Sequence, residues 1–174
     1  MDDLEIDDIL AQKRKKGVNS GRKGKRVERE LAKLLNARFG GGFSRSIGSG
    51  NRWGQVANLP EHAQQTFSGD LVCPPAFAFV IESKGGYDDI DLNSVFIGGN
   101  AELDNFLKQA DDESKRTGRK PLLVWKKNRK PWVVFLKSTD LPSCDYSYRL
   151  YYREWVAIAL EELLKMEDSY FYKK

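Results

Sequence analysis

Apolar residues recur at helical spacing in three segments of the chain, residues 22–38, 103–117 and 154–166. Glycines at positions 40–42 and Gly118 would end the first two helices. The inward positions are Val27, Leu31, Leu34 and Leu35 in the first helix and Val156, Ala159, Leu160, Leu163 and Leu164 in the third. The pattern therefore predicts three amphipathic helices that each bury one side.

Short apolar runs bounded by turn residues predict β-strands over 43–47, 70–73, 77–84, 122–126 and 132–137. Pro74-Pro75 forces a turn between the second and third strands, so these two are expected to pair antiparallel. The order α-β-β-β-α-β-β-α predicts an α/β fold with a central mixed β-sheet flanked by helices.

The charge along the chain is segregated near the N-terminus. Residues 2–8 carry five acidic side chains, whereas residues 13–26 carry eight Lys and Arg and no acid. Such a basic block favours a polyanionic partner, most often nucleic acid. The 174 residues are 40% hydrophobic and 31% charged, which is typical of a soluble globular protein. We expect an N-terminal arm over 1–20 and a single domain over 21–174, with a Tyr-rich extension from about 138.

Cysteine and histidine are too few to support two common kinds of site. Cys73 and Cys144 form no CxxC motif and His62 is the one histidine, so neither a disulfide framework nor a structural zinc site is indicated. No apolar run reaches the ~18 residues that a membrane span needs. The sequence therefore predicts a cytoplasmic protein with no membrane partner.

The predicted strand over 77–84 ends on two charges that would lie on one side of a sheet. Side chains alternate along a strand, so Val80, Glu82 and Lys84 share one side. Asp70 begins the preceding strand, and an antiparallel pairing would bring its carboxylate beside Glu82. A pair of this kind is also typical of a surface salt bridge, and that alternative stays open at this point.

Two neighbouring carboxylates repel each other unless one is protonated or a cation holds both ionised. A hard divalent ion, Mg²⁺ or Mn²⁺, suits carboxylate oxygens together with a backbone carbonyl, here that of Ser83, and water. Such an ion activates water and neutralises charge on a phosphate, and Lys84 would orient or deprotonate that water. The chemistry indicated is phosphodiester hydrolysis.

Four segments occur in a characteristic order: Lys23-Gly24-x-x-Val27-Glu28-Arg29-Glu30-Leu31, Phe43-Ser44-Arg45-Ser46-Ile47-Gly48-Ser49-Gly50, Gly69-Asp70 and Ile81-Glu82-Ser83-Lys84. Together they resemble the archaeal-type Holliday junction resolvases, including phage-encoded relatives, within the PD-(D/E)XK nuclease superfamily. The resemblance covers roughly residues 22–127. It departs from the family at Gly69, where proline is usual, in the long stretch 51–68, and in the Tyr-rich tail.

The resemblance implies a restriction-endonuclease-like core and assigns roles to individual residues. Mg²⁺, with Mn²⁺ as a substitute, would be bound by Glu28, Asp70, Glu82 and the backbone carbonyl of Ser83. The catalytic set would be these three carboxylates with Lys84, Ser49 and Gln109. The residues expected to bind DNA phosphates are Arg22, Lys23, Lys25, Arg26, Arg45 and Arg52.

A four-way junction has two-fold symmetry, so an enzyme that cuts two opposed strands is expected to be a C2 homodimer. The sequence therefore predicts a metal-dependent, structure-selective endonuclease that resolves four-way junctions in a prokaryotic or phage-infected cell. Two alternatives stay open, a nuclease of the same superfamily acting on duplex, flap or single-stranded DNA, and a non-catalytic basic DNA-binding protein. The aromatic residues Tyr146, Tyr148, Tyr151, Tyr152 and Trp155 are expected in the core or a subunit interface rather than stacked on bases.

Overall fold

The computed structural model describes residues 20–46, 68–86, 90, 93 and 97–173, with the side chains of 20–23 excepted. The arm over 1–20, apart from the first residue of a helix, and the stretch 51–67 lie outside the described residues. So do the predicted site residues Ser49 and Arg52, and the side chains of Arg22 and Lys23.

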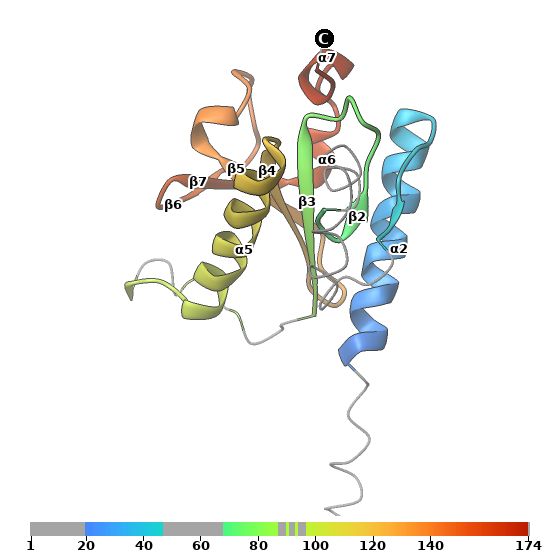
Figure 1. Cartoon of the computed structure of the whole chain (residues 1–174). Coiled ribbons are helices and arrows are strands. Elements are labelled where there is room, and N and C mark those ends of the chain that lie inside the picture. The colour runs from blue at the N-terminus through green and yellow to red at the C-terminus, as the bar shows by residue number, and fades with distance from the viewer. Residues whose placement is uncertain (1–19, 47–67, 87–89, 91–92, 94–96, 174) are drawn as a thin grey trace, which may run out of the picture.

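A five-stranded mixed sheet forms the centre of the molecule, in the order β3-β4-β5-β7-β6 (Figure 1). Its strands are β3 (Phe79–Gly85), β4 (Lys120–Lys126), β5 (Trp132–Lys137), β6 (Leu150–Tyr152) and β7 (Trp155–Ala159). β3 and β4 are parallel and the other neighbours antiparallel. The predicted mixed sheet flanked by helices is confirmed.

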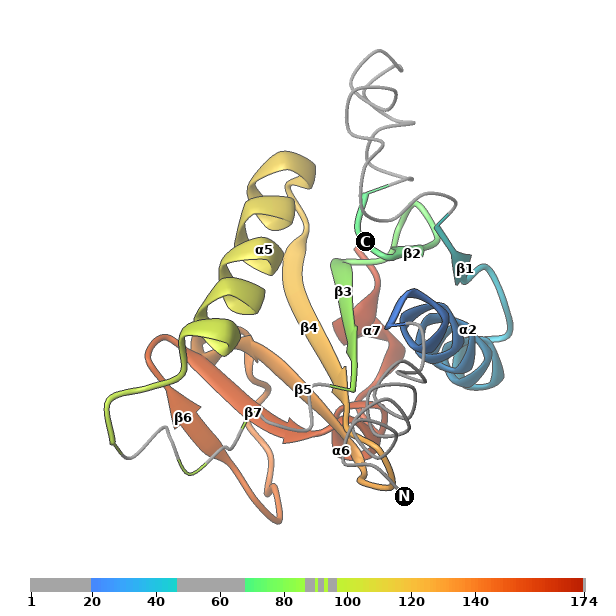
Figure 2. The ribbon, with the colours of Figure 1, turned by 90° about the horizontal axis from the view of Figure 1, so that it is seen from below.

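Helices cover both sides of this sheet (Figure 2). One side packs against α5 (Ala101–Thr117), and the other against α2 (Ser20–Phe39) with two short helices, α6 (Leu160–Leu163) and α7 (Asp168–Phe171). Successive side chains of β3 point to opposite sides of the sheet, and Phe79 and Ile81 belong to the core on the α2 side. Ser83 follows them on that side, which leaves the opposite side of β3 for Glu82 and Lys84.

Capping side chains and glycines mark both ends of α5 and the C-terminal end of α2. Asn100 caps α5 by accepting hydrogen bonds from the N–H groups of Glu102 and Leu103, and Gly118 ends it in the left-handed conformation at φ 63°. The chain leaves α2 through glycines 40–42, all at positive φ, and Asn36 exchanges two hydrogen bonds with the backbone of Phe43. Both predicted helices are confirmed.

The predicted helix over 154–166 is wrong. Residues 155–159 form β7, and only Leu160–Leu163 is helical. Val156 and Ile158 enter the core on the α2 side, while Trp155 and Ala157 enter the core on the α5 side. Because this strand is buried on both sides, its apolar residues are consecutive, and the short helix that follows extends the run at helical spacing.

The expected antiparallel pair of strands 70–73 and 77–84 is also wrong. β2 (Leu71–Val72) pairs with β1 (Ser44–Arg45), and these two strands form a separate ribbon. The ribbon meets β3 through one backbone hydrogen bond, from Asp70 N–H to the carbonyl of Ile81 at 2.9 Å. β3 is therefore the edge strand of the main sheet, and Asp70 still lies beside it.

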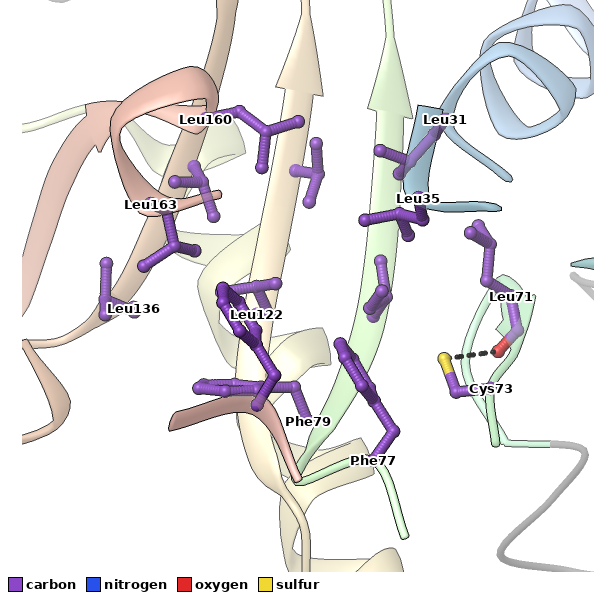
Figure 3. Packing of buried hydrophobic residues seen from close by; sticks show 14 of the residues in the cluster. Leu31, Leu35, Leu71, Cys73, Phe77, Phe79, Leu122, Leu136, Leu160 and Leu163 are labelled. Atoms are coloured by element: carbon purple, nitrogen blue, oxygen red, sulfur yellow. Dashed lines mark hydrogen bonds between the residues drawn. The ribbon is translucent and has the colours of Figure 1, made fainter. Parts of the chain in front are cut away.

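Aromatic and aliphatic side chains fix α2, the ribbon and the chain terminus against β3. Leu31 and Leu35 of α2 lie over the strand, next to Leu71 and Phe77, as Figure 3 shows. Phe77 also packs edge-on against Phe43 and face to face with Phe171. Fully burying side chains of this size stabilises the fold by about 1.5–3 kcal/mol each, which holds the elements around the edge of β3 in place.

The Tyr-rich extension divides into buried and exposed parts. Tyr152 and Trp155 are buried in the core, as expected, and Tyr146 packs against it. Tyr148 and Tyr151 are exposed, so for them the core prediction is wrong and the interface prediction is untested. Among the helices of the described residues, none is long and apolar enough to span a membrane.

Candidate active site

Asp70 lies at the edge of β3 because the backbone before it approaches the strand closely. Gly69 adopts φ 78°, and a Cβ atom at this position would stand 2.6 Å from the carbonyl oxygen of Ile81. The approach lets the N–H of Ser83 donate to Asp70 Oδ2 at 2.8 Å. Glycine replaces the usual proline here, and proline could not adopt this φ.

The pKa of Asp70 is raised from 3.8 to about 7. Burial is the largest cause, followed by the negative charge of Glu82, whereas the Ser83 N–H and the Lys84 ammonium lower the pKa. Glu28 raises it further. The charges of Glu82, Lys84 and Glu28 all act on the Asp70 carboxyl group. The structure therefore brings these four predicted site residues close together.

Glu82 and Lys84 form an ion pair on the α5 side of β3, as the alternation of the strand predicts. Lys84 Nζ lies 2.7 Å from Glu82 Oε1 and 2.7 Å from Gln109 Oε1 of α5. The ring of Phe106 lies 5.0 Å from the same nitrogen. Both charged side chains are less than one-sixth exposed, which makes this pair unlike an ordinary surface salt bridge.

Glu28 lies on the other side of β3, where α2 passes close to the strand. A Cβ atom on Gly85 would meet Val27 Cγ2 at 2.6 Å, so the helix and strand are in tight contact here. Glu28 forms a short ion pair with Arg45 of β1, and their side chains are 10% and 22% exposed. Arg45, predicted to bind DNA, is thus held by a predicted metal ligand.

The donor set fits a hard divalent ion that keeps part of its water shell. Asp70 and Glu82 supply carboxylate oxygens, and Ser83 is 8% exposed with an Oγ that lacks a hydrogen-bond partner among the described residues. Within that part of the chain, no three acidic, histidine or cysteine side chains are close enough to bind a metal ion by themselves. A site of one or two carboxylates completed by water and substrate is the arrangement that Mg²⁺ favours.

Glu113 of α5 is a carboxylate at this site that the sequence analysis missed. Burial raises its pKa, the Arg116 guanidinium lowers it, and the charge of Glu82 raises it. The carboxylate pairs with Arg116, and a hydrogen bond from the backbone of Gly69, next to Asp70, also lowers its pKa. Glu113 follows Gln109 by four residues, so helical spacing could have placed it on the same side of the predicted helix.

Two of the residues predicted to bind DNA, Lys25 and Arg26, lie just before Glu28 in α2. Lys25 and Arg26 are exposed, and Arg26 Nε lies 3.3 Å from Glu30 Oε1. The backbone of Arg22 and Lys23 continues the helix. One helix therefore carries exposed positive charge within about one turn of a site carboxylate.

Comparisons with known proteins identify the family to which the chain belongs. A family model described as "Phage putative PDDEXK endonuclease" matches residues 19–171. Protein D14 of Escherichia phage T5 is 32% identical over 127 residues, which cover 71% of this chain and 74% of that protein. No solved structure matches the chain. PD-(D/E)XK nucleases typically use divalent metal ions, and the predicted superfamily is confirmed, whereas the resolvase subclass stays a prediction. The chain therefore belongs to this family of phage PD-(D/E)XK endonucleases.

Proposed function

We propose that this protein is a Mg²⁺-dependent, structure-selective DNA endonuclease that resolves four-way junctions by paired cleavage. The observation that carries the proposal is the convergence of Asp70, Glu82 and Lys84 at the open edge of β3. Membership of an endonuclease family supports the reaction, and the resemblance to junction resolvases supports the substrate.

Asp70, Glu82 and the backbone carbonyl of Ser83 would bind the ion, with Glu28 as a further carboxylate. When bound, a divalent ion supplies Lewis acidity that activates water and neutralises charge on the phosphate. The Ser83 N–H fixes the orientation of Asp70 by its hydrogen bond to Oδ2. Ser83 therefore serves the site through its backbone.

Lys84 would stabilise the negative charge that develops on the phosphate. Glu82 Oε1 and Gln109 Oε1 hold its ammonium in place from two elements, so little reorganisation is needed during the reaction. Gln109 then acts as a positioning residue for Lys84. This arrangement favours Lys84 as a fixed cation over Lys84 as the base that deprotonates water.

The distribution of charge supports a substrate recognised by its backbone. Lys25 and Arg26 are exposed beside the site, and phosphate contacts of this kind recognise DNA shape rather than base sequence. A junction has two equivalent strands to cut, so a C2 homodimer with two such sites would match its symmetry.

The test is cleavage of a labelled synthetic four-way junction beside duplex, flap and single-stranded DNA of matched sequence. Each substrate is incubated with Mg²⁺, with Mn²⁺ and with a chelator. The variant Glu82→Gln removes the charge from a largely enclosed site carboxylate that is 12% exposed, and Glu161→Gln makes the same change at an exposed position on α6.

Paired, metal-dependent nicks near the branch point are expected for the wild type and Glu161→Gln, and none for Glu82→Gln. Equal cleavage of every substrate would support the nuclease activity and contradict the proposed specificity for four-way junctions. Tight binding of DNA without cleavage under either metal would reject the enzyme in favour of a non-catalytic DNA-binding protein.

A further inference from the structure

The Arg45–Glu28 ion pair joins a residue expected to contact DNA with a carboxylate expected to contact the metal ion. Both side chains are largely buried, and each supplies the other's charge partner. We propose that Arg45 exchanges Glu28 for a DNA backbone phosphate, so that DNA binding releases the Glu28 carboxylate to the metal site. The inference rests on the proposed function and concerns how the binding of DNA and the binding of the metal ion are coupled.

The position of Arg45 brings it within reach of both partners. Arg45 pairs with Leu71 in the ribbon, and the next residue, Ser46, donates its N–H to the carbonyl of Asp70 at 2.9 Å. The side chain is 22% exposed, so part of it is open to solvent beside the site. A guanidinium binds carboxylate and phosphate with the same planar set of donors. A DNA phosphate can therefore take the place of the Glu28 carboxylate on Arg45.

Electrostatics makes the two partners of Glu28 competitors. A divalent ion and a guanidinium in contact with one carboxylate repel each other strongly where water is largely excluded. While Arg45 holds Glu28, the site offers Asp70 and Glu82, which agrees with the lack of three closely grouped ligands among the described residues. Transfer of Arg45 to a phosphate would make the Glu28 carboxylate available as a third ligand of the metal ion.

The exchange implies a measurable linkage between the two ligands. If DNA raises the affinity for the metal ion, the metal ion must raise the affinity for DNA by the same factor. Couplings between sites of this kind are commonly about 5- to 150-fold. Arg45→Gln should weaken this coupling, because Glu28 would then be available to the metal ion at all times.

The first measurement is the Kd of the wild-type full chain for a fluorescent four-way junction, with Ca²⁺ or with a chelator, at matched ionic strength. Ca²⁺ is the probe because it prefers the same oxygen ligands as Mg²⁺. We expect Ca²⁺ to lower the Kd at least about fivefold. In Arg45→Gln we expect weaker binding of the junction and a smaller effect of Ca²⁺ than in the wild type, because only the direct contact between the ion and phosphate remains.

The second measurement is Ca²⁺ binding to the protein without DNA, by calorimetry. Arg45→Gln should bind Ca²⁺ at least about fivefold more tightly than the wild type. Lys165→Gln removes the same charge at an exposed position away from the ribbon and should leave the affinity unchanged. A gain in affinity is informative, because a damaged fold would lose affinity. The gain should disappear when Glu28→Gln is added.

Two outcomes would overturn the exchange. One is a wild-type Kd for DNA that does not respond to Ca²⁺, which needs no variant and stands even if Arg45→Gln fails to fold. The other is unchanged or weaker Ca²⁺ binding by folded Arg45→Gln. Neither assay measures cleavage, so their failure is distinct from failure of the proposed junction-cleaving activity.

Discussion

The Lys84–Glu82 pair lies within one strand of the main sheet, whereas the Arg45–Glu28 pair joins a two-residue strand to a helix. β3 is paired with β4 along its whole length, from Phe79 to Gly85. The ribbon that carries Arg45 has only two paired positions. The two pairs neutralise carboxylates on opposite sides of β3. Lys84 is held by a fully paired strand, whereas Arg45 is held by a strand with two paired positions.

This difference suggests different roles for the two cations. Lys84 is held by a fully paired strand and by Gln109 of α5, so it suits a fixed position during the reaction. Arg45 depends on a short ribbon with few backbone hydrogen bonds, and such segments open at lower free-energy cost than central strands. Arg45 therefore suits an exchange of partners.

The largest expected effect separates the two cations by kinetics. Lys84→Gln should lower kcat for junction cleavage by about 10²–10³-fold, because it removes charge that stabilises the transition state. Arg45→Gln should act mainly on KM and on the Kd for DNA, with a smaller loss of kcat. Single-turnover cleavage measured over a range of enzyme concentrations gives both the maximal rate and the half-saturating concentration. Equal losses of kcat would show that the two pairs do not differ in role.

Gly85→Ala should destabilise the Glu28 side of β3. The new Cβ would stand 2.6 Å from Val27 Cγ2, and overpacking of this kind costs about 1–3 kcal/mol of unfolding free energy. Gly24→Ala is the matched control, because nothing lies closer to its Cβ than Glu28 Oε1 at 3.9 Å.

Denaturant unfolding of both variants gives the comparison. The control should be as stable as the wild type or slightly more so, since alanine favours a helix. Adding Val27→Ala to Gly85→Ala should cost less than the sum of the two single changes. Strict additivity would show that α2 does not press on β3 at this point.

The pH dependence of stability in the presence of chelator should report on Asp70. Its pKa is raised in the folded state to about 7, so between about pH 4 and pH 7 the folded protein keeps a proton that the unfolded chain releases. The contribution of this group to stability therefore falls as the pH rises through that window.

Asp70→Asn removes this dependence. Its thermal stability relative to the wild type should be greater at about pH 8 than at about pH 5, by on the order of 1–2 kcal/mol. The melting temperatures of both proteins across this range measure the effect. A stability difference that is constant with pH would show that Glu82 and burial do not raise the pKa of Asp70.

The smallest expected effect is a chemical probe of the ribbon. Cys73 follows β2 and is buried, and burial raises the pKa of its thiol to about 12, whereas Cys144 is exposed. In a Cys144→Ser variant, a thiol reagent should modify Cys73 slowly, at the rate at which the ribbon opens. Junction DNA should change this rate, and an unaltered rate would argue against movement of the ribbon on binding.

Local patterns in the sequence predicted the elements that hold most of the site. Helical periodicity located α2 and α5, and strand alternation placed Glu82 and Lys84 on one side of β3. These features depend on neighbours in sequence, which the pattern of residues records directly. The proximity of Asp70 to Glu82 was also predicted, although the strand pairing used to derive it was wrong.

Contacts between distant elements were beyond the reach of such patterns. The Arg45–Glu28 pair depends on how α2 packs against the ribbon, and the approach of α2 to β3 depends on the small size of Gly85 opposite Val27. β7 was mistaken for a helix because Trp155–Ala159 is covered on both sides and shows no alternation. Neither feature follows from spacing along the chain alone.

The central claim, that the edge of β3 is a metal-dependent nuclease site, is tested most directly by anomalous diffraction from crystals grown with Mn²⁺. We predict an anomalous peak bonded to carboxylate oxygens of Asp70 and Glu82 and to the Ser83 carbonyl, absent in Glu82→Gln. A wild-type structure with no ion at these oxygens at a saturating Mn²⁺ concentration, and with Asp70 held by the Ser83 N–H alone, would contradict the account.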